Sequence, residues 1–272
     1  MYILAFETTG AQASVACIDE KGNLFAQSSE GVLNHLQNLM PMTESLLKEN
    51  GIAMSDISCV AASTGPGSFT GIRIGVSSAR AVAQAMNIPC ISVPTLPSFS
   101  YNIENYKGLV CPILDARRNQ VYGGAFYVSN DSVKSNLNGG SGEPNLNKNI
   151  GDIHEAVPGG AYDVGEYLQF LRAGIAEQGV SDILFFGDGI KVYQDKVEKW
   201  QSSSLNDDIR LQFAPKDKRG QKASSVAKLA LKLYNEGKQV NYENLMPVYM
   251  RKAEAERKFE EGLLFLKESP HG

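Results

Sequence analysis

The feature that most constrains the fold is an apolar segment that runs into the densest turn cluster of the chain. Residues 57–62 predict a strand, residues 63–68 (STGPGS) predict a tight turn, and the residues after Ser68 predict a helix that reaches about Met86. Strand, glycine-rich turn and helix N-terminus together form an arrangement that binds anions, because free N–H groups and the helix dipole point the same way. However, the Lys-Ser/Thr pair of a Walker P-loop is absent, and N-capping by Ser68 explains the same residues without a ligand.

Around this unit, apolar periodicity predicts a strand-rich opening followed by alternating strands and helices, which is typical of an α/β protein. The predicted strands cover residues 2–6, 13–18, 24–28, 57–62, 88–93, 109–114, 120–128, 183–186 and 209–213. The predicted helices cover residues 34–49, 69–86, 94–101, 161–178, 190–200 and 222–236. Pro41 predicts a kink or a break in the helix at residues 34–49.

A second set of strands begins near Leu109, so we predict two lobes of related topology. The first covers residues 1–104, with the helix at about 222–236 packing back on it, and the second covers residues 105–220. Residues 129–160 are rich in Asn, Gly and Ser and predict a loop or flexible insertion in the second lobe. Residues 251–272 predict a charged, solvated tail.

Composition narrows the classes of function. The 272 residues carry a net charge of −4, whereas proteins that bind nucleic acid alone usually have a basic surplus. No stretch approaches the roughly 18 apolar residues of a membrane span, and no secretory signal is visible. The four cysteines have neither disulfide nor zinc spacing, which indicates reduced, structural thiols and a cytoplasmic protein.

Two strand ends carry polar groups suited to chemistry. Glu7-Thr8-Thr9-Gly10 closes the first strand, where a nucleotide-binding hairpin would offer N–H groups and hydroxyls to phosphate, but a plain β-turn explains it equally. Asp115-Ala116-Arg117-Arg118 with Tyr122 either faces an interlobe cleft or is a turn with surface charges. Catalytic pairing is not predicted, because the three histidines, His35, His154 and His271, have no evident nucleophile or metal partner.

The helix at residues 69–86 is unusually rich in small side chains. Gly71 and Gly75 each cost a helix about 1 kcal/mol relative to alanine, so a close contact should compensate. Arg73, Ser77, Arg80 and Gln84 form one polar stripe, which leaves a small-residue face to be covered. We predict that this face packs against another helix.

Together these segments resemble the TsaB (YeaZ) family. The matching segments are ILAFETT at 3–9, NHLQNLMPM at 34–42, STGPGSFTGIRIG at 63–75, DARRNQVYGGAFY at 115–127, FFGDG at 185–189 and PVYMR at 247–251. The chain departs from the family in two places. Glu7 stands where members often have Asp, and His35-Leu36-Gln37 stands where many have His-Ser-Glu.

The resemblance implies a two-lobed actin/Hsp70-like (ASKHA, RNase H-like) fold and a non-catalytic activating subunit. Such proteins act with the catalytic paralogue TsaD and the ATPase TsaE to transfer threonylcarbamoyl to adenosine 37 of tRNA. The resemblance also implies a homodimer when the chain is alone, contact with tRNA only within the complex, no membrane, no metal, no cofactor, and room for a nucleotide only at the partner interface.

The resemblance further assigns two sets of site residues. The expected partner or dimer interface comprises His35, Leu36, Leu39, Met40, Thr43, Leu47, Phe69, Gly71, Ile72, Gly75, Ser78, Ala79 and Val82. The expected remnant of a nucleotide or anion site comprises Glu7, Thr8, Thr9, Gly65, Gly67, Ser68, Gly187, Asp188 and Gly189. Two alternatives stay open: an actin-fold ATPase or kinase, and a glycoprotease-like hydrolase.

Overall fold

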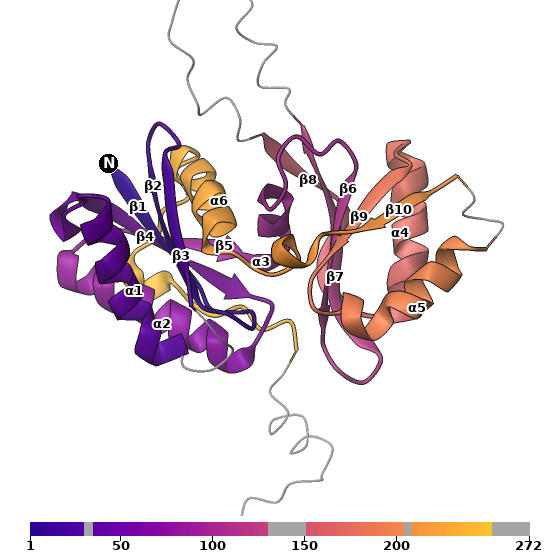
Figure 1. Ribbon diagram of the computed structural model, residues 1–272, viewed down its shortest axis with the longest axis horizontal. Helices are drawn as coiled ribbons and strands as arrows, with labels where there is room; N and C mark the ends of the chain where they lie inside the picture. Colours follow the sequence, from indigo (N-terminus) through magenta and orange to yellow (C-terminus); the bar gives the residue numbers. More distant parts are fainter. Residues whose placement is uncertain (30–34, 130–150, 204–207, 252–272) are drawn as a thin grey trace, which may run out of the picture.

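The structure is a computed structural model that describes residues 1–29, 35–129, 151–203 and 208–251 (Figure 1). Its strands form two five-stranded sheets, with the orders β3-β2-β1-β4-β5 and β10-β9-β6-β7-β8. Each sheet lies in its own lobe, and Figure 1 shows the two lobes side by side. The α/β class and the two-lobed arrangement predicted from the sequence are therefore confirmed.

The first lobe buries both faces of its sheet. Its strands are β1 (Tyr2–Glu7), β2 (Ser14–Asp19), β3 (Leu24–Ser28), β4 (Ile57–Gly65) and β5 (Cys90–Pro94), and its helices are α1 (His35–Glu49), η1 (Met54–Asp56), α2 (Phe69–Met86), α6 (Ala223–Asn235) and η7 (Tyr242–Asn244). Leu4 and Phe6 pack in the core under α1 and α2, whereas Ile3 and Ala5 pack in the core under α6. This burial on both faces explains why β1 is almost continuously apolar.

The second lobe repeats this plan. Its strands are β6 (Leu109–Asp115), β7 (Gln120–Ser129), β8 (Asp152–Asp163), β9 (Asp182–Phe186) and β10 (Arg210–Phe213), and its helices are α4 (Val164–Gln178), α5 (Ile190–Gln201) and η6 (Lys216–Lys218). Read from the opposite edge, its order β8-β7-β6-β9-β10 matches that of the first sheet strand for strand, with the same parallel and antiparallel pairs. β1 is therefore equivalent to β6, β4 to β9, and α2 to α5.

The lobes are joined by an apolar plug. The short helices α3 (Thr95–Ser98) and η2 (Phe99–Tyr101) follow β5 and place Leu96 and Phe99 in one core with β6, β7 and β9 of the second sheet. Phe99 lies against Phe186, with ring centroids 5.9 Å apart. In Figure 1 α3 lies between the two lobes, where it covers the face of the second sheet opposite α4 and α5.

Two expectations from the sequence need correction. Of the kink or break predicted at Pro41, the break does not occur: helix α1 continues through Pro41, since Leu39, Met42 and Leu46 on either side anchor it in the core. The predicted loop at residues 129–160 includes β8, which pairs with β7 from Gln120↔Asp163 to Ser129↔Asp152. The glycines and proline of β8 suggested a loop, but they lie where the pairing register shifts. The rest of that segment, residues 130–150, lies outside the described residues, as does the tail from residue 252.

All four cysteines are free and buried, as predicted. Burial raises the pKa of Cys17 and of Cys59 to about 12, so these thiols stay protonated and unreactive at neutral pH. No helix within the described residues is long and apolar enough to cross a membrane.

Candidate functional site

The duplicated topology places a carboxylate at the same point of each lobe. Strand β1 ends at Glu7 and its equivalent β6 ends at Asp115. Each carboxylate accepts a hydrogen bond from the backbone N–H two residues further on, Thr9 N to Glu7 Oε1 at 2.5 Å and Arg117 N to Asp115 Oδ1 at 2.9 Å. The two turns therefore share this contact, but their backbone conformations and surroundings differ.

In the first lobe the carboxyl group is sealed inside the protein. Glu7 is fully buried; its Oε1 also accepts from the Thr9 hydroxyl at 2.6 Å, and its Oε2 has no hydrogen-bond partner. Burial raises the pKa of Glu7, although the hydrogen bonds from Thr9 partly offset this effect. The start of α2 closes the turn, because Ser68 N donates to Thr9 O at 2.8 Å.

The first-lobe members of the expected anion site therefore do lie together, but they contact one another. The Thr8 hydroxyl donates to Gly71 O at 2.7 Å, and a Cβ atom on Gly67 would lie 2.6 Å from Thr9 Cβ. Glu7, Thr8 and Thr9 are at most 2% exposed. These side chains form their hydrogen bonds and packing contacts within the chain and are not presented to a ligand in this structure.

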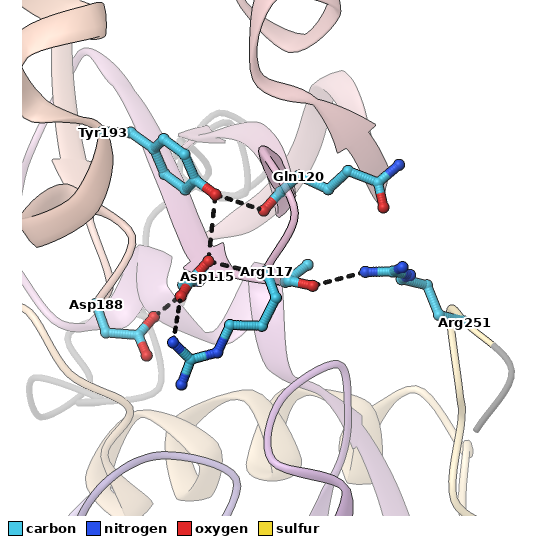
Figure 2. A network of polar contacts seen from close by, with 7 residues as sticks. Asp115, Arg117, Gln120, Asp188, Tyr193 and Arg251 are labelled. Atoms are coloured by element: carbon cyan, nitrogen blue, oxygen red, sulfur yellow. Dashed lines mark hydrogen bonds and ion pairs between the residues drawn. The ribbon is translucent and has the colours of Figure 1, made fainter. Parts of the chain in front are cut away.

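In the second lobe the equivalent turn is more open and carries a polar network (Figure 2). The Tyr193 hydroxyl donates to Asp115 Oδ1 and to Gln120 O, both at 3.2 Å, and Arg117 Nη1 lies 3.2 Å from Asp115 Oδ2. Asp188 Oδ1 accepts from Asp115 N at 3.0 Å. Burial raises the pKa of Asp188; the hydrogen bond from Asp115 N partly offsets this, and the charge of the Asp115 carboxylate adds to the increase.

The backbone of this turn is strained. Arg117, Arg118 and Asn119 have φ values of 65°, 54° and 62°, a left-handed run that costs L-residues about 1–2 kcal/mol each. The run is held in place by the Asp115 carboxylate and by Arg251, whose Nη1 donates to Ala116 O at 2.6 Å (Figure 2). Backbone strain of this kind persists only where surrounding contacts determine it.

The Gly187-Asp188-Gly189 turn lies on this second-lobe site and not beside Glu7. Gly189 N donates to Ile113 O at 3.1 Å, and a Cβ atom on Gly187 would lie 2.1 Å from the same oxygen. Its link to the first turn runs through the chain that follows β10: Gly187 N donates to Arg219 O at 2.8 Å, and Gln221 packs against Gly10.

Most residues of the expected partner interface are buried inside the chain itself. A Cβ atom on Gly71 would lie 1.9 Å from Thr8 O, and one on Gly75 would lie 2.4 Å from Thr8 Oγ1. The glycines therefore allow α2 to approach the end of β1 of its own chain. The following predicted interface residues are buried in the same way: Leu39, Thr43, Leu47, Gly71, Ile72, Gly75, Ala79 and Val82.

The outer face of α1 and α2 consists of other residues. Met40 is 41% exposed, Phe69 and Ser78 are half-buried, and the side chains of His35 and Leu36 lie outside the described residues. The exposed residues of α2 are Thr70, Arg73, Ser77, Ala81, Gln84 and Ala85. They include Arg73, Ser77 and Gln84 of the predicted polar stripe. The sequence therefore separated the two faces of α2 correctly, but the residues assigned to the partner lie on the face that packs inside the chain.

Residues 246–251, which we call the strap, run along this outer face. Tyr249 stacks on Phe69 with ring centroids 4.4 Å apart, and Arg73 Nε donates to the Tyr249 hydroxyl at 3.0 Å. Met246 and Val248 are 55% and 49% exposed. The strap adds an apolar border to the small and polar face of α2, a feature that sequence periodicity could not reveal.

One nucleophile–base pair that was not expected is present. Ser129 Oγ lies 2.8 Å from His154 Nε2, and the Tyr127 ring stacks on the His154 ring at 5.0 Å. His154 is exposed and Ser129 is half-buried, and the pair lies at the end of β7 and β8 opposite Asp115. The neighbouring Asp152 is bound by Lys232, so the pair is not part of a triad with that carboxylate. Within the described ranges, no group of three or more His, Cys, Asp or Glu could hold a metal ion.

The chain is similar to known proteins of threonylcarbamoyladenosine formation in tRNA. Residues 28–259 match the family model described as "TsaD: tRNA N6-adenosine threonylcarbamoyltransferase". Among curated relatives, the "tRNA threonylcarbamoyladenosine biosynthesis protein TsaB" of Bacillus subtilis is 28% identical over 259 residues, covering 95% of this chain and 98% of that protein. The protein of the same name from Escherichia coli is 27% identical, covering 92% of this chain and 95% of that protein.

A solved structure, "YeaZ from Pseudomonas aeruginosa", superposes with a TM-score of 0.68 at 25% identity, covering 91% of this chain and 99% of that chain. The actin-like fold expected from the resemblance agrees with this match and with the duplicated topology. The chain belongs to the family of the TsaD model, and within that family it is of the TsaB (YeaZ) type.

Proposed function

We propose that this chain is a non-catalytic, activating subunit in the formation of threonylcarbamoyladenosine at position 37 of tRNA. The observation that carries the proposal is its similarity, over nearly its full length, to proteins named for threonylcarbamoyladenosine biosynthesis. The sealed carboxyl of Glu7 supports a non-catalytic role, because a buried group bonded to its own turn is not positioned to act on a substrate.

The partner in this proposal is a TsaD-type transferase, which binds the outer face of α1 and α2 together with the strap. This face offers Ser77, Ala81 and Ala85 one turn apart, and such short side chains permit close approach of a second helix. In the absence of the partner, two copies of the chain pair through the same face, and the partner then displaces the second copy. A TsaE-type ATPase and tRNA join through the complex. A nucleotide, if one is bound, lies at the partner interface.

The test is co-expression with the TsaD-type protein of the same genome, followed by size-exclusion chromatography. Ala81→Arg and Ala85→Arg place long charged side chains on the proposed face and should abolish co-elution. Ala173→Arg and Ala176→Arg, at equally exposed alanines of α4, are matched controls and should co-elute normally. If the two pairs behave alike, the face is wrongly assigned; if the wild-type chain does not co-elute, the proposed partner is wrong.

An assay of ATP hydrolysis by the isolated chain distinguishes the ATPase alternative from the proposed function. We expect no hydrolysis. The Ser129–His154 pair does not favour the hydrolase alternative, because His154 is exposed, Ser129 is only half-buried and Asp152 is bound by Lys232. Ser129→Ala should accordingly leave tRNA modification by the complex unchanged.

A further inference from the structure

The segment that connects the two lobes after β10 is strongly basic. Residues 216–222 contain four basic residues and one acidic residue, a local charge of +3 in a chain whose net charge is −4. Figure 1 shows its short helix, drawn in orange, between the lobes. The rest of the chain carries more acidic than basic residues, so the charge of this segment is opposite in sign to the net charge of the rest of the chain.

The backbone of this segment is fixed to both lobes. Asn102 Nδ2 donates to Lys218 O at 2.9 Å and to Gly220 O at 2.8 Å, and between them Arg219 O accepts from Gly187 N at 2.8 Å. Three successive carbonyls are thus bonded to the protein, and Ala223 N then donates to Ser14 Oγ at 2.9 Å. The lysines of the segment are therefore presented from an ordered frame.

The lysine side chains form no close ion pairs in the part of the chain that the structure describes. Lys216 and Lys218 are exposed and Lys222 is half-buried, and none of the three forms an ion pair with any residue that the structure describes. The nearby Glu104 is bound by Lys228 Nζ at 3.0 Å, which lowers the pKa of this carboxyl, and the charge of Lys218 adds a smaller decrease without an ion pair. The Asp188 carboxylate accepts from Asp115 N. An external anion is thus the natural partner for these ammonium groups.

We propose that residues 216–222 bind phosphate groups of the tRNA backbone within the assembled complex, an inference that rests on the proposed function. A nucleic acid fits better than an acidic protein, because protein interfaces need an apolar core and this segment contributes no apolar side chain. Lysine is a compact charge suited to phosphate, and a few such contacts act without reading sequence. The overall negative charge explains why the chain alone would bind tRNA weakly.

The test compares three complexes of the full chain with its TsaD-type partner: wild type, Lys216→Ala/Lys218→Ala, and the control Lys191→Ala/Lys199→Ala. The control removes two equally exposed lysines from α5. Binding of a fluorescently labelled tRNA is measured by anisotropy between 50 and 300 mM salt, roughly the range in which phosphate contacts dominate. The first variant should lose on the order of tenfold in affinity at about 0.15 M salt, and the slope of log K against log salt should fall by about one unit per lysine.

The control should match the wild type in both quantities. If the first variant binds tRNA with wild-type affinity and slope, the inference is overturned while the proposed function stands. If the variant instead fails to co-elute with the partner protein, the segment binds protein and the inference is equally overturned. If the wild-type chain forms no complex at all, it is the proposed function that fails.

Discussion

Replacing Gly71 by alanine should destabilise the fold, although alanine is the better helix former. The added Cβ atom would lie 1.9 Å from Thr8 O, a backbone atom at the buried end of β1. Reaching even 3.0 Å requires α2 or β1 to move by about 1 Å, and both are fixed by the Thr8–Gly71 and Ser68–Thr9 hydrogen bonds.

The size of the effect follows from two opposing terms. Helix propensity favours alanine by about 1 kcal/mol, whereas overpacking of a well-packed site costs about 1–3 kcal/mol and here falls at the upper end, since the obstacle is backbone. We therefore expect Gly71→Ala to lower the free energy of unfolding by about 2 kcal/mol. Urea denaturation followed by circular dichroism measures this difference directly.

The matched control is Thr70→Ala, one position earlier on the same helix and exposed. It gains helix propensity without meeting the strand, so its stability should equal or exceed that of the wild type. The folded fraction of Gly71→Ala should still bind the partner. A Gly71→Ala protein as stable as the wild type, or one that is stable but unable to bind the partner, would show that the glycine serves an intermolecular contact and would refute the reasoning.

Three further predictions concern the turns and the strap. Burial raises the pKa of Glu7 in the folded chain above its ordinary value of 4.5. The protonated carboxyl therefore contributes to stability below pH 4.5, and this contribution is lost as the pH rises through the folded pKa. Urea midpoints from pH 4 to 8 should fall for the wild type and stay flatter for Glu7→Gln. Tyr249→Ala removes the stacking on Phe69 and should cost about 1–2 kcal/mol in thermal unfolding, whereas Val192→Ala, at an exposed valine of α5, should cost little. Glu7→Ala, Asp115→Ala and His35→Ala should each change tRNA modification by less than about tenfold at saturating subunits, since acid–base residues typically contribute roughly 10²–10⁴-fold; a loss above about a hundredfold with the complex intact would place chemistry in this chain.

Much of the fold could be predicted because its local patterns agree with its tertiary structure. The run from β4 through the glycine-rich turn into α2 has strand, turn and helix signals in sequence, and the structure places them at Ile57–Gly65 and Phe69–Met86. Strand β8 could not be predicted, because Pro158, Gly159 and Gly160 suggest a loop locally and only pairing with β7 makes them extended.

The orientation of α2 was beyond sequence reasoning for a different reason. Gly71 and Gly75 indicate that something approaches the helix closely, but Ser77, Ala81 and Ala85 on the opposite face are also small. Periodicity separates these two faces without saying which one meets the chain's own sheet. The decision depends on Thr8, more than sixty residues earlier in the chain, whose hydroxyl bonds to Gly71.

The two equivalent turns show how a duplicated fold can assign different roles to one position. At Glu7 the donors of the turn are used internally and α2 closes over the carboxyl, so this turn stabilises the face on which a partner helix would rest. At Asp115 the same carboxylate contact occurs in a left-handed turn, which carries an exposed arginine and accepts a hydrogen bond from Arg251, the last described residue of the strap. Since Tyr249 of the same strap stacks on Phe69 at the start of α2, the outer face of the first lobe and the strained turn of the second lobe are connected by three residues of chain. Under the proposed function, a partner bound on α2 contacts an element that also fixes the second lobe, so the strap is the physical link between the proposed partner surface and the second lobe.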